Sequence, residues 1–301
     1  MTDNARRTSS RPDFVIDQNW SDYSADEHAV WDTLYAHQRA LLDGRADDAM
    51  LEGMQALDLG RGGIPDFAVL NAELRALTGW TVVAVPSLVP DAVFFDHLAN
   101  RRFPAGAFIR AREQIDYIEE PDIFHDVFGH VPMLTNPVFA DYMQAYGAGG
   151  LRAHSFGRLE NLAALYWYTV EFGLIDTPAG LRIYGAGIAS SRKESRFALE
   201  DPSPNRIRFD LERLMRTRYR IDDFQQSYFV IRSYDELFRA TVETDFAPLY
   251  ARLSNNLRFA PEETLPTDAL LHKGTQAYAH SGGRLAPPPS SAIETLVPRS
   301  V

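Results

Sequence analysis

The stretch from Pro121 to Pro132 reads Pro-Asp-Ile-Phe-His-Asp-Val-Phe-Gly-His-Val-Pro, and it decides how the rest of the chain is interpreted. It contains two histidines, His125 and His130, which lie five residues apart. On an ideal α-helix five residues turn through about 500°, which leaves the two side chains about 140° apart around the helix axis. We therefore expect both imidazoles to reach one ion only if His130 lies where a helix unwinds.

The neighbouring residues predict a short helix with such an end. Pro121 and Asp122 suit a first turn, because proline is accepted there and a carboxylate complements the exposed N–H groups. Gly129 permits an irregular backbone immediately before His130, and Pro132 stops the helix from resuming. The apolar residues between the histidines predict a largely dry site, in which neutral imidazoles can bind iron, zinc or copper. The alternative is two core histidines that each bond a carbonyl group, unless a carboxylate from elsewhere joins them.

The composition is that of a globular protein. With 301 residues, 45% of them hydrophobic, the chain is long enough for one large core. The formal net charge of -11 argues against a nucleic-acid-binding protein, since a phosphate-binding surface is basic. The absence of cysteine excludes disulfides and thiolate ligands and leaves His, Asp and Glu as metal ligands. We find no signal peptide and no apolar run of membrane-spanning length, so we expect a cytoplasmic protein that binds no membrane.

The apolar periodicity predicts more helices than strands. Ser24, with Glu27 three residues later, is typical of a capped helix N-terminus, and Gly147, Gly149 and Gly150 are expected to end a later helix. Helices are predicted from residue 24 to 41 and at 46–57, 65–77, 94–98, 138–146, 159–174, 210–215 and 233–242. Strands are predicted at 80–85 and 103–109, near 183, and within 222–231.

One carboxylate is out of place in the apolar helical run 159–174. Glu171 lies among aromatic and aliphatic residues, where an unpaired carboxylate is costly. A buried acid needs a cation, a metal or a proton, so an arginine partner is one explanation and a metal is the other. With His125 and His130 it would form a set of two histidines and one carboxylate, which leaves adjacent positions open on Fe(II).

These residues carry a resemblance to a known family. The sequence closely resembles the pterin-dependent aromatic amino acid hydroxylases, and most closely the short bacterial phenylalanine hydroxylases. The resemblance covers roughly residues 14–250 and rests on three motifs in the same order, which are residues 120–132, Tyr166-Trp-Tyr-Thr-Val-Glu-Phe-Gly-Leu, and Tyr184-Gly-Ala-Gly-Ile-Ala-Ser-Ser.

The resemblance implies an α+β fold that is predominantly α-helical, with a few short strands around a mononuclear iron site. It implies a single catalytic domain over residues 14–280, between a disordered segment 1–13 and a flexible tail 281–301. It implies Fe(II) on His125, His130 and Glu171. The residues implied in substrate binding are Arg110, which would anchor the substrate carboxylate, Asp122, which would orient it, and Pro121, Trp167, Phe172, Gly187 and Ser190. Those implied in binding a tetrahydropterin are Ser87, Leu88, Val89, Phe94 and Asp126.

The chain departs from the animal relatives at several points. It has Pro90 and Asp91 where they carry serines, and Asp126 where they carry glutamate, so the pterin contacts are less closely matched than the metal ligands. A shorter acid at Asp126 is expected to reach the pterin only through solvent. The sequence has no match to their N-terminal regulatory domain or C-terminal tetramerisation helix, and we expect a monomer.

The implied activity is conversion of L-phenylalanine to L-tyrosine with O2, Fe(II) and a tetrahydropterin. Trp167 would occupy space that an indole substrate needs, so phenylalanine is expected to be preferred. Hydroxylation of tryptophan or tyrosine is the nearest alternative. A zinc hydrolase is another, because two histidines and a glutamate also bind catalytic zinc, although Asp126 is the only nearby candidate for a general base and its spacing is unsuitable. A scaffold that binds these ligands without turnover is the third.

Overall fold

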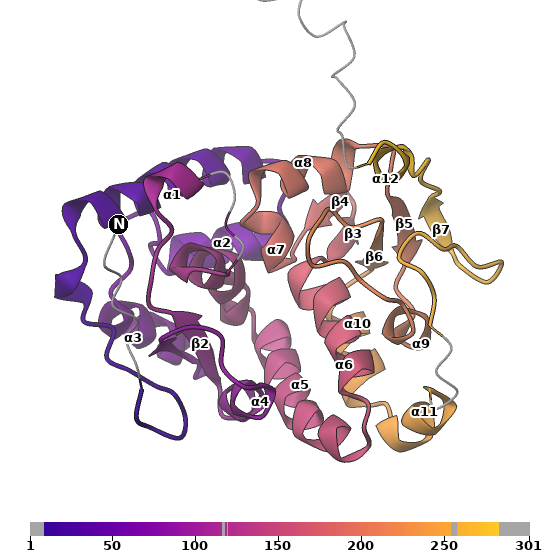
Figure 1. Ribbon diagram of the computed structural model, residues 1–301, viewed down its shortest axis with the longest axis horizontal. Helices are drawn as coiled ribbons and strands as arrows, with labels where there is room; N and C mark the ends of the chain where they lie inside the picture. The colour runs from indigo at the N-terminus through magenta and orange to yellow at the C-terminus, as the bar shows by residue number, and fades with distance from the viewer. Residues whose placement is uncertain (1–8, 116–117, 119, 254–257, 283–301) are drawn as a thin grey trace, which may run out of the picture.

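The computed structural model describes residues 9–115, 118, 120–253 and 258–282. Helices predominate, and in this part of the chain the strands form one two-stranded and one five-stranded sheet, which confirms the expected α+β class. Figure 1 shows the N-terminal helices on one side, the five-stranded sheet on the other, and α5 and α6 between them. One hydrophobic cluster extends from Tyr23 to Leu253, so both sides share a core.

The N-terminal helices begin at side-chain caps. The Ser24 hydroxyl accepts from the Glu27 amide and the Glu27 carboxylate accepts from the Ser24 amide, which confirms the capping box. Asp47 and Asp66 cap the next two helices through the amides two residues later. These elements are η1 (Trp20–Asp22, a 3-10 helix), α1 (Ala25–Leu42), α2 (Asp48–Ala56) and α3 (Phe67–Thr78).

A parallel strand pair follows, with one helix as the crossover. β1 (Thr81–Val85) pairs with β2 (Arg102–Gly106), and α4 (Asp91–Ala99) connects them. Val85 lies opposite Gly106, so both strands end at the same edge. The loop after β1 carries the residues predicted to bind pterin, and the segment after β2 leads through Arg110 and η2 (Arg112–Gln114, 3-10) to the two histidines.

The stretch that holds the histidines is helical from Ile123 onward, but it is not the α-helix that the spacing argument assumed. η3 (Phe124–His130) is a π-helix, and η4 (Val131–Thr135, 3-10) continues it directly. Hydrogen bonds in a π-helix join residues five apart, so each turn is wider and residues at that spacing lie nearly above one another. The expectation that His130 lies where the helix unwinds is therefore wrong.

Gly129 has a different function from the one expected. It is not among the glycines with positive φ, and a Cβ atom there would lie 2.9 Å from the Ala186 carbonyl oxygen. The glycine allows close approach of α7 (Ala186–Ala189) to η3.

The helix after η4 is longer than predicted. Asn136 caps α5 (Pro137–Ser155), and the helix passes through Gly147, Gly149 and Gly150 without ending. A Cβ on Gly147 would lie 2.4 Å from the Ala99 amide nitrogen, and one on Gly150 would lie 2.0 Å from Cδ1 of Phe95. Two of these glycines therefore allow α4 to pack closely on α5, and the expectation that they end the helix is wrong.

The C-terminal half builds the larger sheet, whose strand order is β4-β3-β6-β5-β7. The predicted helix 159–174 is divided into an α-helix and a π-helix and ends at Glu171, before β3 begins. The elements are α6 (Leu159–Tyr166), η5 (Trp167–Glu171, π), β3 (Leu174–Thr177), β4 (Gly180–Ile183), α8 (Arg192–Glu200), β5 (Asn205–Arg208), α9 (Leu211–Met215), β6 (Ser227–Ile231), α10 (Tyr234–Val242), α11 (Phe246–Arg252), β7 (Leu270–His272) and α12 (Ala277–His280).

Two predictions about the chain ends fall largely outside the described residues. Residues 1–8 and 283–301 belong to the segments expected to be disordered or flexible, and that expectation stays a prediction. Across the described ranges, none of the helices is long and apolar enough to cross a membrane.

The packing of α4 on α5 predicts opposite effects of two similar substitutions. Gly147→Ala should lower the free energy of unfolding by about 1–3 kcal/mol, because the new methyl group collides with the α4 backbone. Gly149→Ala is the matched control. Its Cβ would meet only a side-chain nitrogen of Arg152 at 4.0 Å, so it should stabilise the protein by about 0.5–1 kcal/mol through helix propensity. Urea unfolding of both variants measures the difference, and equal effects would contradict this account.

Candidate metal centre and active site

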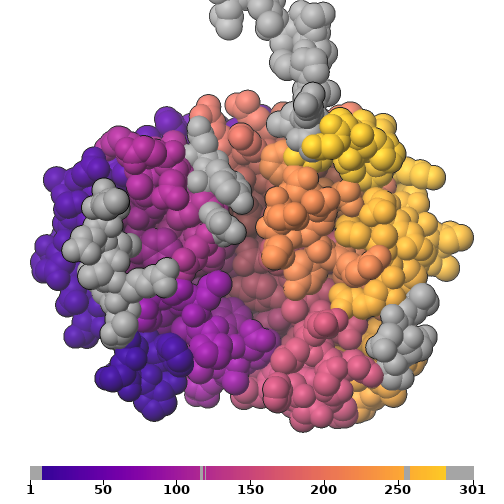
Figure 2. Space-filling model, viewed as in Figure 1, coloured from indigo at the N-terminus to yellow at the C-terminus, as the bar shows by residue number. Residues whose placement is uncertain are grey.

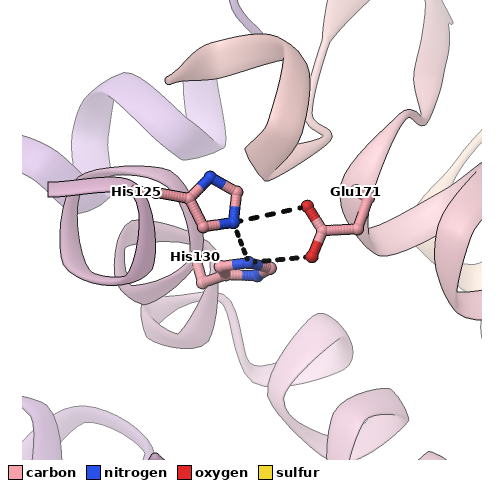
Figure 3. Close-up of side chains that lie close together, drawn as sticks. All are labelled: His125, His130 and Glu171. Atoms are coloured by element: carbon pink, nitrogen blue, oxygen red, sulfur yellow. Dashed lines mark hydrogen bonds and ion pairs between the residues drawn. The ribbon is translucent and has the colours of Figure 1, made fainter. Parts of the chain in front are cut away.

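Three side chains that could hold a metal converge at the centre of the molecule. The ligand atoms of His125, His130 and Glu171 all lie within 4.8 Å of one another. Nε2 of His130 is 3.1 Å from Oε1 of Glu171, and Nε2 of His125 is 3.6 Å from Oε2 and 3.4 Å from Nε2 of His130. Figure 3 shows the two imidazoles projecting from one helix toward the carboxylate on the opposite segment.

Both segments that supply these ligands are π-helices. The wider turn of η3 brings His125 and His130 to one side, and Glu171 is the last residue of η5, where the Phe172 amide donates to the Trp167 carbonyl at 2.8 Å. A Cβ on Gly187 would lie 3.1 Å from Oε2 of Glu171, so α7 also needs a glycine beside the carboxylate.

A serine sets the protonation of His125. The Ser190 hydroxyl donates to the Ala186 carbonyl at 2.9 Å, and Nδ1 of His125 lies 2.9 Å from the same hydroxyl oxygen. Because the serine proton is already donated, the Nδ1–H of His125 donates to Ser190 and Nε2 keeps its lone pair. This outer hydrogen bond is the usual companion of a metal-binding imidazole.

The electrostatics favour a bound cation. Burial lowers the pKa of His125 to about 4, against the opposing attraction of Glu171, so the imidazole is neutral near pH 7. Burial alone would raise the pKa of Glu171, but the two histidines and the hydrogen bonds from His130 and the Gly187 amide lower it overall. Two imidazoles and one ionised carboxylate are a suitable ligand set for Fe(II).

Arg110, the predicted substrate anchor, forms a buried ion pair with Asp122, which in turn is hydrogen-bonded to the helix η3 that carries the two histidines. Nε and Nη2 of Arg110 donate to the two oxygens of Asp122 at 2.8 and 2.7 Å, and the Asp122 side chain is fully buried. Asp122 also accepts from the backbone amide of His125 at 3.1 Å. Within the described part of the chain Nη1 of Arg110 has no hydrogen bond, so the guanidinium retains a donor group for a ligand.

The Asp126 side chain is hydrogen-bonded to the last residue of β2. Its Oδ2 accepts from the Gly106 amide at 2.7 Å, and burial raises the pKa of its carboxyl to about 7, although this hydrogen bond acts in the opposite direction. Pro121 is half-buried, and its carbonyl oxygen lies near Gly106. The residues expected at the substrate and at the pterin thus meet at the end of this strand.

The residues predicted along the pterin edge lie on the loop after β1. Ser87 and Leu88 are exposed and Val89 is half-buried, and the Ser87 hydroxyl donates to the exposed carboxylate of Glu120. Figure 2 shows that this face of the molecule is hollowed near its centre, between the purple N-terminal half and the orange C-terminal half.

Phe94 connects this side of the site to the metal centre. Its ring lies 5.7 Å from the ring of Tyr166, which in turn is stacked on His130 at 6.2 Å. The sequence analysis missed Tyr166 as a site residue, and its position five residues before Glu171 on the same helical run was the available signal.

The residues expected to form the aromatic pocket pack against one another. The ring centroids of Trp167 and Phe172 are 4.8 Å apart, and Phe172 lies beside Gly187, where a Cβ would meet its ring at 2.9 Å. Tyr219 stacks on the Trp167 ring at 4.6 Å, and Gln225 accepts a hydrogen bond from the indole. Tyr219 and Gln225 were also missed, and no local pattern marks them.

The comparisons with known proteins agree with this geometry. Residues 18–257 match the family described as biopterin-dependent aromatic amino acid hydroxylase. The chain belongs to this family. It is therefore an iron- and pterin-dependent monooxygenase, and the zinc hydrolase alternative is not supported.

Several relatives are similar over nearly their whole length. The chain is 68% identical over 277 residues to phenylalanine-4-hydroxylase of Caulobacter vibrioides, covering 92% of this chain and 94% of the relative. It is 59% identical over 266 residues to that of Ralstonia nicotianae, covering 88% and 85%. The iron- and phenylalanine-bound crystal structure of phenylalanine hydroxylase from Chromobacterium violaceum matches with a TM-score of 0.85 and 54% identity, covering 89% of this chain and 97% of that one.

Removal of one ligand should remove the metal. Glu171→Ala should weaken Fe(II) binding by more than about 100-fold. Losing a metal ligand lowers the metal affinity more than losing a hydrogen-bond partner of a ligand does. Glu160→Ala on α6 is the control, since it removes the same charge from an exposed carboxylate. Titration of metal-free protein with Fe(II) measures both, and wild-type affinity in Glu171→Ala would remove Glu171 from the ligand set.

The buried carboxyl group of Glu194, which accepts a hydrogen bond from the Gln225 amide, predicts that the stability of the protein depends on pH. Burial raises the pKa of Glu194 to about 7 from its ordinary 4.5, although the Tyr228 hydroxyl and the Gln225 amide both donate to it. The folded state therefore binds more protons than the unfolded state between these values, and stability should fall as the pH rises from 4.5 to 7, by on the order of 1 kcal/mol per pH unit.

Glu194→Gln should remove the contribution of Glu194, which leaves that of the Asp126 carboxyl, and be more stable than the wild type above pH 7. The control is Glu200→Gln at the exposed end of the same helix, which should keep the dependence of the wild type. Denaturant unfolding at pH 5 and pH 8 measures the slopes, and an unchanged slope in Glu194→Gln would contradict the assignment.

Proposed function

We propose that this protein is a phenylalanine 4-monooxygenase, which converts L-phenylalanine to L-tyrosine with O2 and a tetrahydropterin. The observation that carries the proposal is that one region combines three possible iron ligands, a buried arginine and a pair of aromatic side chains. All of them lie in segments that match phenylalanine hydroxylases.

The chain's own residues would mainly bind and orient the reactants. Fe(II) on His125, His130 and Glu171 and the tetrahydropterin supply the oxygen activation and the electrons. Arg110, oriented by Asp122, has a free donor group for the carboxylate of an amino acid. This fixes one end of the substrate at the metal helix, because Asp122 also bonds the His125 amide.

The aromatic end of the substrate would lie against Trp167 and Phe172. Both side chains are half-buried and lie on or directly after η5, so a ring held there is close to Glu171. We place the pterin between the loop at Ser87 to Val89 and the ring of Phe94. The apolar residues Phe124, Val127 and Phe128 are fully buried around the histidines and exclude water from the site.

The test is tyrosine formation from phenylalanine by Fe(II)-loaded protein in air, with and without a tetrahydropterin. We expect tyrosine only with the pterin. We expect kcat/KM for phenylalanine to exceed that for tryptophan by about tenfold or more, because Trp167 restricts the pocket. No tyrosine from protein that holds iron would contradict the proposed activity, and equal values for the two substrates would contradict the assigned pocket.

A monomeric state and a cytoplasmic location stay predictions of the sequence. Light scattering on the purified protein measures the first, and fractionation of cells that express it measures the second.

A further inference from the structure

The Trp167 indole is held by residues that lie outside the metal centre. Its Nε1–H donates to Oε1 of Gln225 at 2.9 Å. The ring of Tyr219 stacks on it at a centroid distance of 4.6 Å and an interplanar angle of 19°, and Phe172 packs on it at 4.8 Å. The half-buried Trp167 side chain is thus restrained both in the plane of its ring and perpendicular to it.

The Gln225 side chain has one possible orientation. Its Nε2 donates to the carbonyl oxygens of Arg220 at 2.8 Å and Asp223 at 3.3 Å, so Oε1 must face the indole. The residue is only 2% exposed, and loss of its acceptor would leave the indole N–H without a partner. This amide therefore specifies the direction of the Trp167 N–H.

The backbone of Gln225 is anchored as well. Its amide donates to Oε1 of Glu194 on α8 at 3.3 Å, and the Tyr228 hydroxyl on β6 donates to the same oxygen. Glu194 is 5% exposed and Tyr228 is fully buried. The acceptor that meets the indole is thus fixed by a helix and by the central part of the five-stranded sheet.

The orientation of the indole determines the shape of the pocket. Trp167 is the first residue of η5 and Glu171 is the last, and the Trp167 carbonyl accepts from the Phe172 amide. Phe172 packs beside Gly187, where a Cβ would lie 2.9 Å from its ring, so the glycine leaves room for this side chain. A tilt of the indole would change the distance between the rings of Trp167 and Phe172, which are 4.8 Å apart.

We propose that Gln225 is a positioning residue that holds the Trp167 indole in one orientation and thereby makes the pocket select a one-ring over a two-ring amino acid. The inference rests on the proposed function, since it concerns the same substrate pocket. Gln225 contacts neither the metal ligands nor the Arg110–Asp122 pair, and it acts only through Trp167.

The experiment compares Gln225→Met, which keeps the side-chain length but removes the acceptor, with the wild type. We expect kcat/KM for phenylalanine to fall about tenfold, which corresponds to about 1.4 kcal/mol, chiefly through KM, since the indole donor loses its acceptor. The ratio of kcat/KM for phenylalanine to that for tryptophan should fall by about fivefold or more, with iron content unchanged. Gln226→Met is the matched control, because the neighbouring side chain makes no hydrogen bond within the described residues.

Two further measurements separate positioning from a merely structural effect. In a Trp167→Phe background, Gln225→Met should leave the substrate ratio unchanged, because the donor that it serves is gone. In 15N spectra, which show four indole groups, the Trp167 signal should shift in Gln225→Met while the other three stay in place.

The proposal is overturned if folded Gln225→Met keeps the wild-type substrate ratio, or if its effect is equally large without the indole. Gln225→Asn, which withdraws the acceptor by one methylene group, serves as the second variant. If neither variant folds with iron bound, Gln225 is a structural residue and the proposal is wrong. Wild-type protein assayed in parallel tests the proposed function separately, because a wild type that forms no tyrosine contradicts that function rather than this inference.

Discussion

The structure depends on the placement of one carboxylate, Glu171, in an apolar interior. A buried carboxylate without a partner is unfavourable, and here two imidazoles approach it to within 3.1 and 3.6 Å. Such a set of ligand atoms suits a cation, and the family to which the chain belongs uses iron at this site. Both helices that supply the ligands are π-helices, which are rare and typically occur at functional sites.

The metal centre is connected directly to the groups that would bind substrate. Asp122 bonds both the guanidinium of Arg110 and the backbone amide of His125, so the arginine and the first metal ligand share one buried carboxylate. On the opposite side Ser190 fixes the tautomer of His125. The relative positions of Arg110 and His125 are therefore set by hydrogen bonds to one buried carboxylate.

A second set of contacts holds Trp167 from the C-terminal half. Gln225 accepts from the indole of Trp167, and its own amide donates to Glu194, which also accepts from the Tyr228 hydroxyl. This explains why the five-stranded sheet belongs to the same unit as the metal-binding helices. The sheet supports the indole that we assign to the substrate pocket, while the N-terminal strands and α4 bring the segments that we assign to the pterin.

Much of the fold could be predicted because local signals are strong where side chains bond their own backbone. Ser24 with Glu27 predicted a helix start, and the structure has the capping box there. The errors occurred where tertiary contact outweighs local propensity. Gly147 and Gly150 are typical of helix ends, but here they are helix-interior residues that accommodate the backbone of Ala99 and the ring of Phe95.

The sequence by itself determined the chemistry of the centre. With no cysteine available, two histidines at a spacing of five and an isolated glutamate in an apolar run indicate a metal site, and the motifs indicate the family. Only the tertiary structure decided how that spacing works and what supports the pocket. The π-helical turn of η3 and the hydrogen-bond partner of the Trp167 indole depend on segments that lie far away in the chain. The approach of those segments cannot be deduced from the residues next to His125 or Trp167.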